Sequence, residues 1–443
     1  MKKILLYTLM TVAAAGMTAC EDFLTRDTYD QIGSDEFWKS ETDLELYANG
    51  FIQKMIPGDG TITRGDIDAD YCAVDIATDL LRPDGNVSPD NQGGWTESSW
   101  TNLRRVNYML DNMHRCRGRV SDEVYNHYEG VARFWRAWFY YDKVRTFGAV
   151  PWYDFTISAS DKEALTNPRD SREYVMDKVL EDLTFASTYC LADAKYTKGS
   201  ALINKWVALA FKSRVCLYEG TFRKYHGIAD ETIDGVTISA DYFLQLAADA
   251  AWAVMEQNKY SLYKGNTLKL DAPYREYFIL EDGDAKETIL SMRFNADILV
   301  RHGIQFTFRN MRHSATQRLV NHYLMADGSK IQDQPGYETM TYNQQFQNRD
   351  PRMAQTLMAP GYVDLNGIDE VIEDCKSYDM TGYRFIKFVS DDTHNGATTS
   401  TTDWPVFRYP EILLTYAEAK AELGTLTPED IALTVDIVRD RVG

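Results

Sequence analysis

The feature that most constrains the fold is the run EGVARFWRAWFYYDKVRTFGAVPWYD (residues 129–154), which carries aromatic and aliphatic side chains at helical spacing. One face of such a helix carries Val131, Phe134, Trp135, Trp138 and Tyr141, and the opposite face carries Arg133, Arg136, Tyr140 and Lys143. This stripe predicts an amphipathic helix that buries its aromatic face, including Trp138, in a core. Gly148, with Pro151 beyond it, predicts where the helix ends.

A second helix is predicted in INKWVALAFKSRVCLYEG, which is apolar on nearly all sides and ends at Gly220. Its small residues would let a neighbouring helix approach closely, and they are Ala208, Ala210 and Ser213. A third helix is predicted to start near Asp241 and to run through FLQLAADAAWAVMEQ. These patterns are typical of buried helices packed in pairs.

A fourth helix is predicted in YPEILLTYAEAKAELG, with Pro410 in its first turn and Gly424 as its stop. Its apolar stripe is expected to comprise Leu413, Leu414, Ala417 and Ala421. Together the four segments favour an all-α fold of tetratricopeptide-like helix pairs, although the strict 34-residue pattern of such repeats is not continuous. Long turn-rich segments lie between the helices, and loops of this length are commonly functional.

The N-terminus has the pattern of an export signal. Lys2 and Lys3 precede an apolar run from Ile4 to Ala15, and small residues lead to Cys20. The run is too short to span a bilayer. The sequence therefore predicts a lipoprotein signal peptide over residues 1–19 and acylation of Cys20; a cleaved signal with an incidental cysteine is the alternative.

The charge of the chain argues against a nucleic-acid-binding protein, and its cysteine content argues against a fold stabilised by disulfides. The formal net charge is −19, so nucleic acid and anionic membrane surfaces would be repelled. Of the 6 cysteines, Cys20 is expected to carry lipid, and the odd number that remains cannot all pair within the chain. Disulfides are therefore not expected to hold the fold together.

No common catalytic or cofactor signature is present: the sequence lacks G-x-S-x-G, H-E-x-x-H, C-x-x-C and the phosphate-binding G-x-x-x-x-G-K pattern. Asp66, Asp68 and Asp70 imitate the start of a calcium loop, but Tyr71 and Ala77 stand where that loop needs glycine and glutamate. No metal and no cofactor are therefore predicted. A pair of carboxylates of the glycosidase kind stays open, because such a pair is defined in space.

Six segments, taken in order, resemble the signature segments of the SusD/RagB family of Bacteroidota outer-membrane nutrient-binding lipoproteins. They are Cys20 with EDFL, FWKSETDLELYANGF, ARFWRAWFYYDKVRTFGAVP, SATQRLVNHYLMADGSK, NRDPRM and DWPVFRYPEILLTYAEAKAELG. The resemblance implies a SusD-like α-α superhelix of tetratricopeptide type decorated with long loops. It divides the chain into an N-terminal SusD-like region over residues 20–220 and a RagB/SusD region over residues 221–443.

The resemblance also implies a function. A protein of this family is held by its lipid on the outer face of the outer membrane, binds oligosaccharide and caps a SusC-like TonB-dependent transporter, without being an enzyme. A peptide-binding, RagB-like member and a secreted glycan-active enzyme are the alternatives. The last segment, TVDIVRDRVG, resembles a family helix that is normally followed by more chain, so we expect the sequence to be truncated at its C-terminus.

Ligand-binding residues are sought among aromatic and polar side chains on loops, since sugars offer apolar C–H faces and hydroxyl edges. Trp95, in a loop rich in Gly and Asn, is predicted to be a stacking platform, whereas Trp100 is expected to begin a helix core. The other predicted ligand residues are Tyr274, Tyr277 and Arg275 in one loop, and Asn102 and Arg82 as polar contacts.

Overall fold

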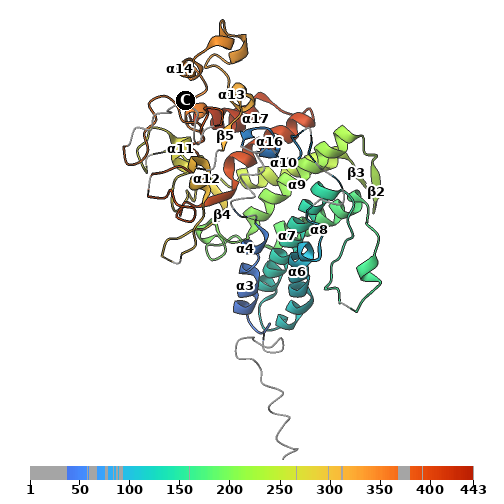
Figure 1. Ribbon diagram of the computed structural model, residues 1–443. Coiled ribbons are helices and arrows are strands. Elements are labelled where there is room, and N and C mark those ends of the chain that lie inside the picture. The colour runs from blue at the N-terminus through green and yellow to red at the C-terminus, as the bar shows by residue number, and fades with distance from the viewer. Residues whose placement is uncertain are drawn as a thin grey trace, which may run out of the picture.

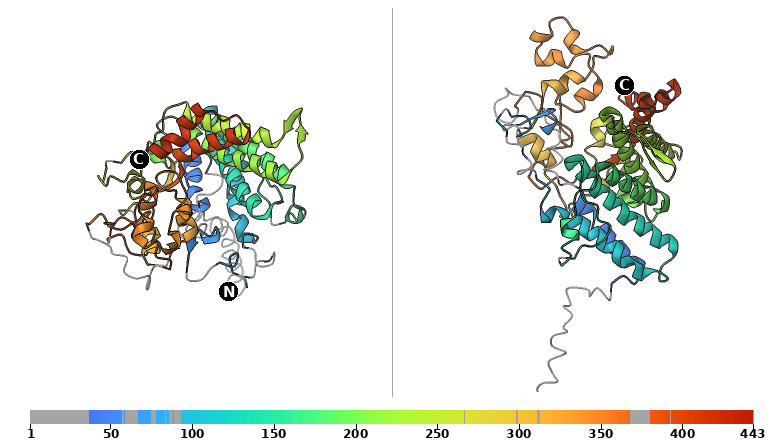
Figure 2. Two further views of the ribbon diagram at one scale, coloured as in Figure 1. Left: turned by 90° about the horizontal axis from the view of Figure 1, so that it is seen from above. Right: turned by 90° about the vertical axis from the view of Figure 1, so that its right-hand side faces the viewer.

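The computed structural model describes residues 37–442 apart from 57, 59–66, 75–77, 83, 86–87, 89–92, 159, 266, 298, 311–312, 368–379 and 392. Long helices form one side of the molecule, and short helices, strands and loops between α10 and α16 form the other (Figures 1 and 2). The predicted all-α fold with long decorating loops is confirmed. Within the described part, no helix has the length and apolar character needed to cross a membrane.

The long helices pack in chain order. They are α3 (Glu41–Asn49), α6 (Thr101–Asn112), α7 (Asp122–Phe147), α8 (Arg172–Tyr189), α9 (Lys205–His226), α10 (Ala240–Met255) and α16 (Tyr409–Glu422). From α7 to α10 each helix contacts the next, and α16 packs against α10, while α3 and α6 both pack against α7 (Figure 1). This is the expected succession of antiparallel helix pairs.

The helix α7 begins and ends where local chemistry directs it. The Ser121 hydroxyl accepts a hydrogen bond from the Val124 amide at 3.3 Å, and Gly148 takes a positive φ of 69° after the last turn. The expected contrast between its two faces is wrong, because Tyr140 and Arg136 are as buried as the aromatic stripe. Trp138, in turn, is only partly buried, at the edge of the core against Phe211.

The helix α9 does not end at Gly220, as the sequence had indicated, but continues to Gly227, which has a left-handed φ of 63°. Gly220 instead lets α10 approach: a Cβ atom there would lie 2.7 Å from Leu244 Cγ. The helix α10 starts one residue before Asp241, with Ser239 as its N-cap.

The stripe predicted for α16 is half right. Leu413 and Ala417 are buried, but Leu414 is 43% exposed and Ala421 is exposed. Ile412 and Ala419 are buried instead, because α10 packs against this side of α16.

Short strands, which the sequence analysis did not foresee, form three antiparallel pairs. They are β1 (Cys72–Ala73) with β5 (Ser314–Ala315), β2 (Glu231–Ile233) with β3 (Val236–Ile238), and β4 (Thr288–Met292) with β6 (Trp404–Arg408). In the last pair Thr288 lies opposite Arg408 and Met292 opposite Trp404. Leu290 and Phe407 from this pair join the main core.

The remaining elements are short. They are α4 (Ile52–Met55), η2 (Glu97–Trp100), η3 (Met113–Cys116), η4 (Ala164–Thr166), η5 (Lys198–Ser200), α11 (Pro273–Tyr277), α12 (Ile304–Asn310), α13 (Gln317–His322), η6 (Ile331–Asp333), η7 (Tyr337–Thr339), α14 (Tyr342–Gln345), α15 (Pro351–Ala354), α17 (Pro428–Ile431), η8 (Ala432–Asp436) and α18 (Ile437–Asp440).

Buried ion pairs tie neighbouring helices together. The Arg136 guanidinium on α7 donates twice, at 2.7 Å each, to Asp182 on α8, and Arg172 on α8 donates to Glu219 on α9 at 2.6 and 2.9 Å. Both carboxylates are nearly inaccessible to solvent. The four cysteines in the described part are buried and form no disulfide with one another, so these helices are held by packing and by these ion pairs.

Candidate functional site

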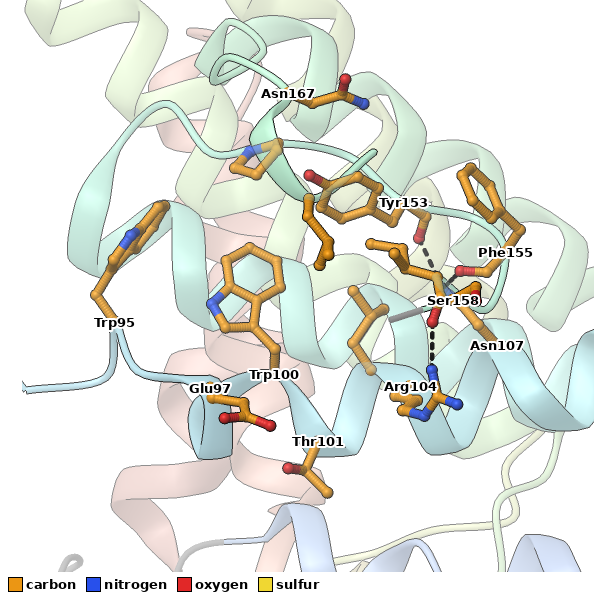
Figure 3. Close-up of a pocket in the computed structure, with 14 residues that line it drawn as sticks. Trp95, Glu97, Trp100, Thr101, Arg104, Asn107, Tyr153, Phe155, Ser158 and Asn167 are labelled. Atoms are coloured by element: carbon orange, nitrogen blue, oxygen red, sulfur yellow. Dashed lines mark hydrogen bonds between the residues drawn. The ribbon is translucent and has the colours of Figure 1, made fainter. Parts of the chain in front are cut away.

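A cavity of about 650 Å³ lies between α6 and the segment that follows α7 (Figure 3). Its lining comprises Trp95, Glu97, Trp100, Thr101, Leu103, Arg104, Asn107, Pro151, Tyr153, Phe155, Ile157, Ser158, Leu165 and Asn167. The lining therefore combines four aromatic rings with polar and charged groups.

The aromatic rings form a continuous series along the cavity. The Trp95 and Trp100 ring centroids lie 5.5 Å apart with the planes at 89°, and Trp100 lies 6.2 Å from Tyr153 at 75°. Tyr153 is followed by Phe155 at 6.3 Å and 88°. These edge-to-face arrangements fix the rings against each other, so the wall is formed before any ligand arrives.

The loop that carries Trp95 is tied to α7. The Lys143 ammonium donates to the Gly94 carbonyl at 2.5 Å, and burial lowers the pKa of Lys143. Gly94 needs its positive φ of 90° at this point, and the Trp95 ring lies 4.9 Å from Phe147. Arg169 covers one face of Trp95 at 4.6 Å, so Trp95 offers a ligand no more than its other face.

The wall segment, residues 151–158, carries Tyr153 and Phe155 and is held through its backbone. Asn107 Nδ2 donates to the carbonyls of Tyr153 and Phe155, at 2.9 Å each, and Arg104 donates to the carbonyl of Ile157 (Figure 3). The Tyr140 hydroxyl accepts from the Tyr153 amide at 2.6 Å. Side chains of α6 and α7 thus fix a segment that has no regular secondary structure of its own.

From residue 151 to residue 157 the lining side chains of this segment alternate along the chain, and Ser158 follows directly. Residues 151, 153, 155 and 157 line the cavity, whereas Trp152 stacks on Tyr140 at 4.3 Å and Asp154 lines a separate charged cavity behind it. The Tyr153 hydroxyl donates to the Ala164 carbonyl at 2.6 Å, and burial, then the charge of Asp170, raises the pKa of that phenol.

Only one of the ligand residues predicted from sequence lines this cavity. Trp95 does so and is 37% exposed. Asn102 points to the other side of α6, where its Nδ2 donates to the Lys54 carbonyl at 2.9 Å and it lines a smaller cavity of about 240 Å³ beside Trp138. Arg82 pairs with Asp79 at 2.7 Å and is outside the lining.

The three predicted residues of α11 lie elsewhere. Tyr277 and Arg275 are buried, and the Arg275 guanidinium stacks on Tyr362 at 4.4 Å. Tyr274 lines a third cavity of about 470 Å³, where its hydroxyl accepts from Lys387 at 2.9 Å. Burial would raise the pKa of Tyr274, but nearby cations, Lys387 first, lower it below its usual value.

The sequence analysis missed Tyr153, Phe155 and Arg104, and it assigned Trp100 to a helix core. Trp100 in fact ends η2 and is partly exposed in the cavity. The missed signal is the alternation in PWYDFTI, where every second residue from Pro151 is apolar. Cys20 and Asp66 lie outside the described residues, and within those residues no cluster of three His, Cys, Asp or Glu side chains could hold a metal.

Two family models match the chain. Residues 22–217 match a family described as starch-binding associating with outer membrane, and residues 309–443 match the SusD family. SusD-like protein P2 of Formosa agariphila is 26% identical over 245 residues, which are 53% of this chain and 46% of that relative. The chain thus spans about half the length of this curated relative.

Two crystal structures of Bacteroides fragilis proteins share the fold. A SusD-like protein superposes with a TM-score of 0.68 at 22% identity, over 92% of this chain and 80% of its own. A SusD-like carbohydrate binding protein superposes with a TM-score of 0.70 at 19% identity, over 92% and 79%. The two model matches and the shared fold confirm the family expected from the sequence segments, and the chain belongs to the SusD/RagB family.

Proposed function

We propose that this protein binds oligosaccharide in the aromatic cavity and does not convert it. The observation that carries the proposal is the preformed series of rings from Trp95 to Phe155, beside polar groups on the same cavity. Rings can stack on the apolar faces of sugars, while Asn167 and Ser158 can bond hydroxyl groups. The cavity is within the range of about 300 to 1,000 Å³ that small ligands occupy.

We further propose that Cys20 carries the lipid and holds the protein on the outer face of the outer membrane, where it caps a SusC-like TonB-dependent transporter. The description of the family matched by residues 22–217 supports the membrane association. Capture at the surface followed by transfer to a barrel gives a binding protein without catalytic groups a role in uptake. Co-purification with the transporter from mild detergent tests the partner.

Calorimetric titration of the full chain with neutral and charged oligosaccharides and with peptides tests the site. Trp100→Ala should weaken binding about tenfold, because a stacked aromatic contributes roughly 0.5 to 1.5 kcal/mol beyond its buried area. Trp252→Ala is the matched control, since Trp252 is 41% exposed on α10 and outside the lining.

The outcomes separate the possible functions. Equal affinities for Trp100→Ala and Trp252→Ala would show that the ligand does not bind in this cavity. Tight binding of peptides alone would replace oligosaccharide by peptide as the ligand. Shortened products after incubation with the saccharides, detected by mass spectrometry, would show an enzyme.

A further inference from the structure

Two arginines stand at the cavity although the chain as a whole is strongly acidic. Arg104, on the second turn of α6, lines the cavity between the aromatic rings and Ser158 (Figure 3). Arg169 stacks at 4.6 Å on Trp95, the ring at the other side of the same view. Both residues are exposed. A positive charge is therefore present at each side of the aromatic wall.

Neither charge is neutralised within the described residues. Arg104 makes one hydrogen bond there, to the Ile157 carbonyl, and no ion pair; Arg169 makes its ring contact and no ion pair. Many other arginines of this chain do pair with carboxylates, as Arg136 and Arg172 do. Most of the five N–H donors of the Arg104 guanidinium are thus available to a ligand.

The only carboxylate in the lining is Glu97. In Figure 3 Glu97 lies with Thr101 on the lower side of the η2–α6 junction, away from Tyr153 and Phe155. The other polar lining groups are uncharged hydroxyls and amides. The face that carries the aromatic wall is consequently cationic.

We propose that the saccharide taken by this cavity is anionic, with a carboxylate or sulfate group held by Arg104 while a sugar ring packs on Trp100 and Tyr153. This inference rests on the proposed function and adds the ligand class. A planar guanidinium matches both anions with two parallel hydrogen bonds, which a neutral hydroxyl cannot reproduce. The Ile157 carbonyl bond holds the guanidinium in place, so less side-chain freedom is lost when the anion binds.

The test uses matched pairs of saccharides on the full chain. Oligogalacturonate, oligomannuronate and oligoguluronate are each titrated beside their carboxyl-reduced neutral counterparts, and sulfated galactan oligosaccharides beside their desulfated forms. We expect at least one acidic member to bind about tenfold more tightly than its neutral counterpart. That advantage should shrink as salt is raised, because the arginines are exposed.

Variants assign the effect to Arg104. Arg104→Gln should abolish the preference for the charged form over the neutral form, and Arg104→Lys should keep part of it. Arg105→Gln is the control, since Arg105 is the next residue of α6, is also exposed, and bonds Asn102 at 3.0 Å outside the cavity. Thermal melts of all three variants establish that they are folded.

Equal binding of charged and neutral members, or a preference that survives Arg104→Gln, would overturn the anionic class while leaving the proposed function intact. If Arg105→Gln lost the preference for charged saccharides as fully as Arg104→Gln does, the preference would be a general charge effect, and the proposed role of Arg104 would be overturned as well. If no saccharide binds, the proposed function fails together with the inference.

Discussion

Asn107 connects α6 to the cavity wall through a single amide group. The residue is 1% exposed, and its Nδ2 bonds the two carbonyls of Tyr153 and Phe155. Its Oδ1 has no hydrogen-bond partner among the described residues. The spacing of the wall therefore depends on two donors from one side chain.

Asn107→Leu should destabilise the protein and weaken saccharide binding together. The part-buried Phe155 carbonyl would lose its donor, and the Tyr153 carbonyl would keep only the Tyr140 hydroxyl at 3.3 Å. An unsatisfied group costs roughly 1 to 3 kcal/mol, so we expect a loss of about that size. Urea unfolding gives the first quantity and titration the second. Asn112→Leu is the control, because its Nδ2 bonds only the Tyr108 carbonyl of the same helix, at 2.8 Å. Similar losses in both variants would contradict the role assigned to Asn107.

Asp403 should make the free energy of unfolding depend on pH. Burial raises its pKa to about 6, although Arg293 lies 2.7 Å away and lowers it. Between the unfolded value of 3.8 and about 6 the folded state binds more protons, so stability should fall as pH rises through this window, by up to about 3 kcal/mol. Asp403→Asn should be the more stable form at pH 7 and should lose the part of the slope that Asp403 contributes, while Asp177, whose pKa burial also raises to about 6, should keep its own part.

The control for Asp403 is Asp282→Asn. Asp282 also pairs with Arg293, at 2.9 Å, but its side chain is 94% exposed. Its replacement should change the slope of unfolding free energy between pH 4 and 6 less than Asp403→Asn does, because the charge of Asp282 makes only the smallest of the contributions to the raised pKa of Asp403. An Asp403→Asn protein with the wild-type slope would show that other groups set the pH dependence.

At the residue scale, sequence reasoning reached Trp95 because its loop setting is local. It did not reach Arg104, Tyr153 and Phe155 as one site, because the α6 helix and the wall segment lie about 50 residues apart and meet only through hydrogen bonds such as those of Asn107. Burial of Tyr277 likewise depends on Thr288, its hydroxyl partner at 2.7 Å. Side-chain type alone does not carry that information.

At the scale of elements, the contact between α7 and α8 rests partly on the buried pair of Arg136 and Asp182. Arg136→Gln should cost about 3 to 5 kcal/mol of unfolding free energy, because it leaves the buried Asp182 carboxylate with only the more distant Arg133, at 3.6 Å, as a partner charge. Arg145→Gln is the control: that arginine pairs with Asp142 at 3.1 Å on the surface, where a pair contributes about 0 to 1 kcal/mol. Denaturant unfolding of both variants checks the difference, and equal losses would contradict it.

Four of the long helices, α7, α9, α10 and α16, could be predicted, since their periodicity and their flanking Gly and Pro residues are local signals. The end of α9 could not, because Gly220 looks like a stop and serves as a contact point for Leu244 on α10. The pairing of β4 with β6 was also out of reach: its strands are more than 100 residues apart, and their register depends on the helices on which they pack.

At the scale of the whole molecule, one core joins both ends of the described chain. The same cluster contains Trp38, before α3, and Val438, in α18. The boundary expected at residue 220 falls within α9, and the two regions stay a prediction. Continuous packing of this kind favours cooperative unfolding of the long helices.

The predicted lipid anchor at Cys20 can be tested in cells. Cys20→Ala should release the protein from the membrane fraction in cells without the transporter, because each buried methylene of an acyl chain is worth about 0.8 kcal/mol and stable anchoring needs more than one chain. Labelling with an alkyne fatty acid should fail in this variant and persist in Thr25→Ala. Retention of Cys20→Ala in the membrane would contradict lipid anchoring at this residue.

The alternation along the wall segment has a consequence for how such proteins diversify. The backbone from 151 to 158 is held by Asn107, Arg104 and Tyr140, which bond main-chain atoms and are indifferent to the side chains there. Phe155 and Ile157 face the cavity and have no side-chain hydrogen bonds to lose. Substituting Phe155 and Ile157 by other residues should therefore change which ligands the cavity accepts while the hydrogen bonds to the backbone stay in place. A library randomised at positions 155 and 157 should yield folded proteins with new ligand specificity.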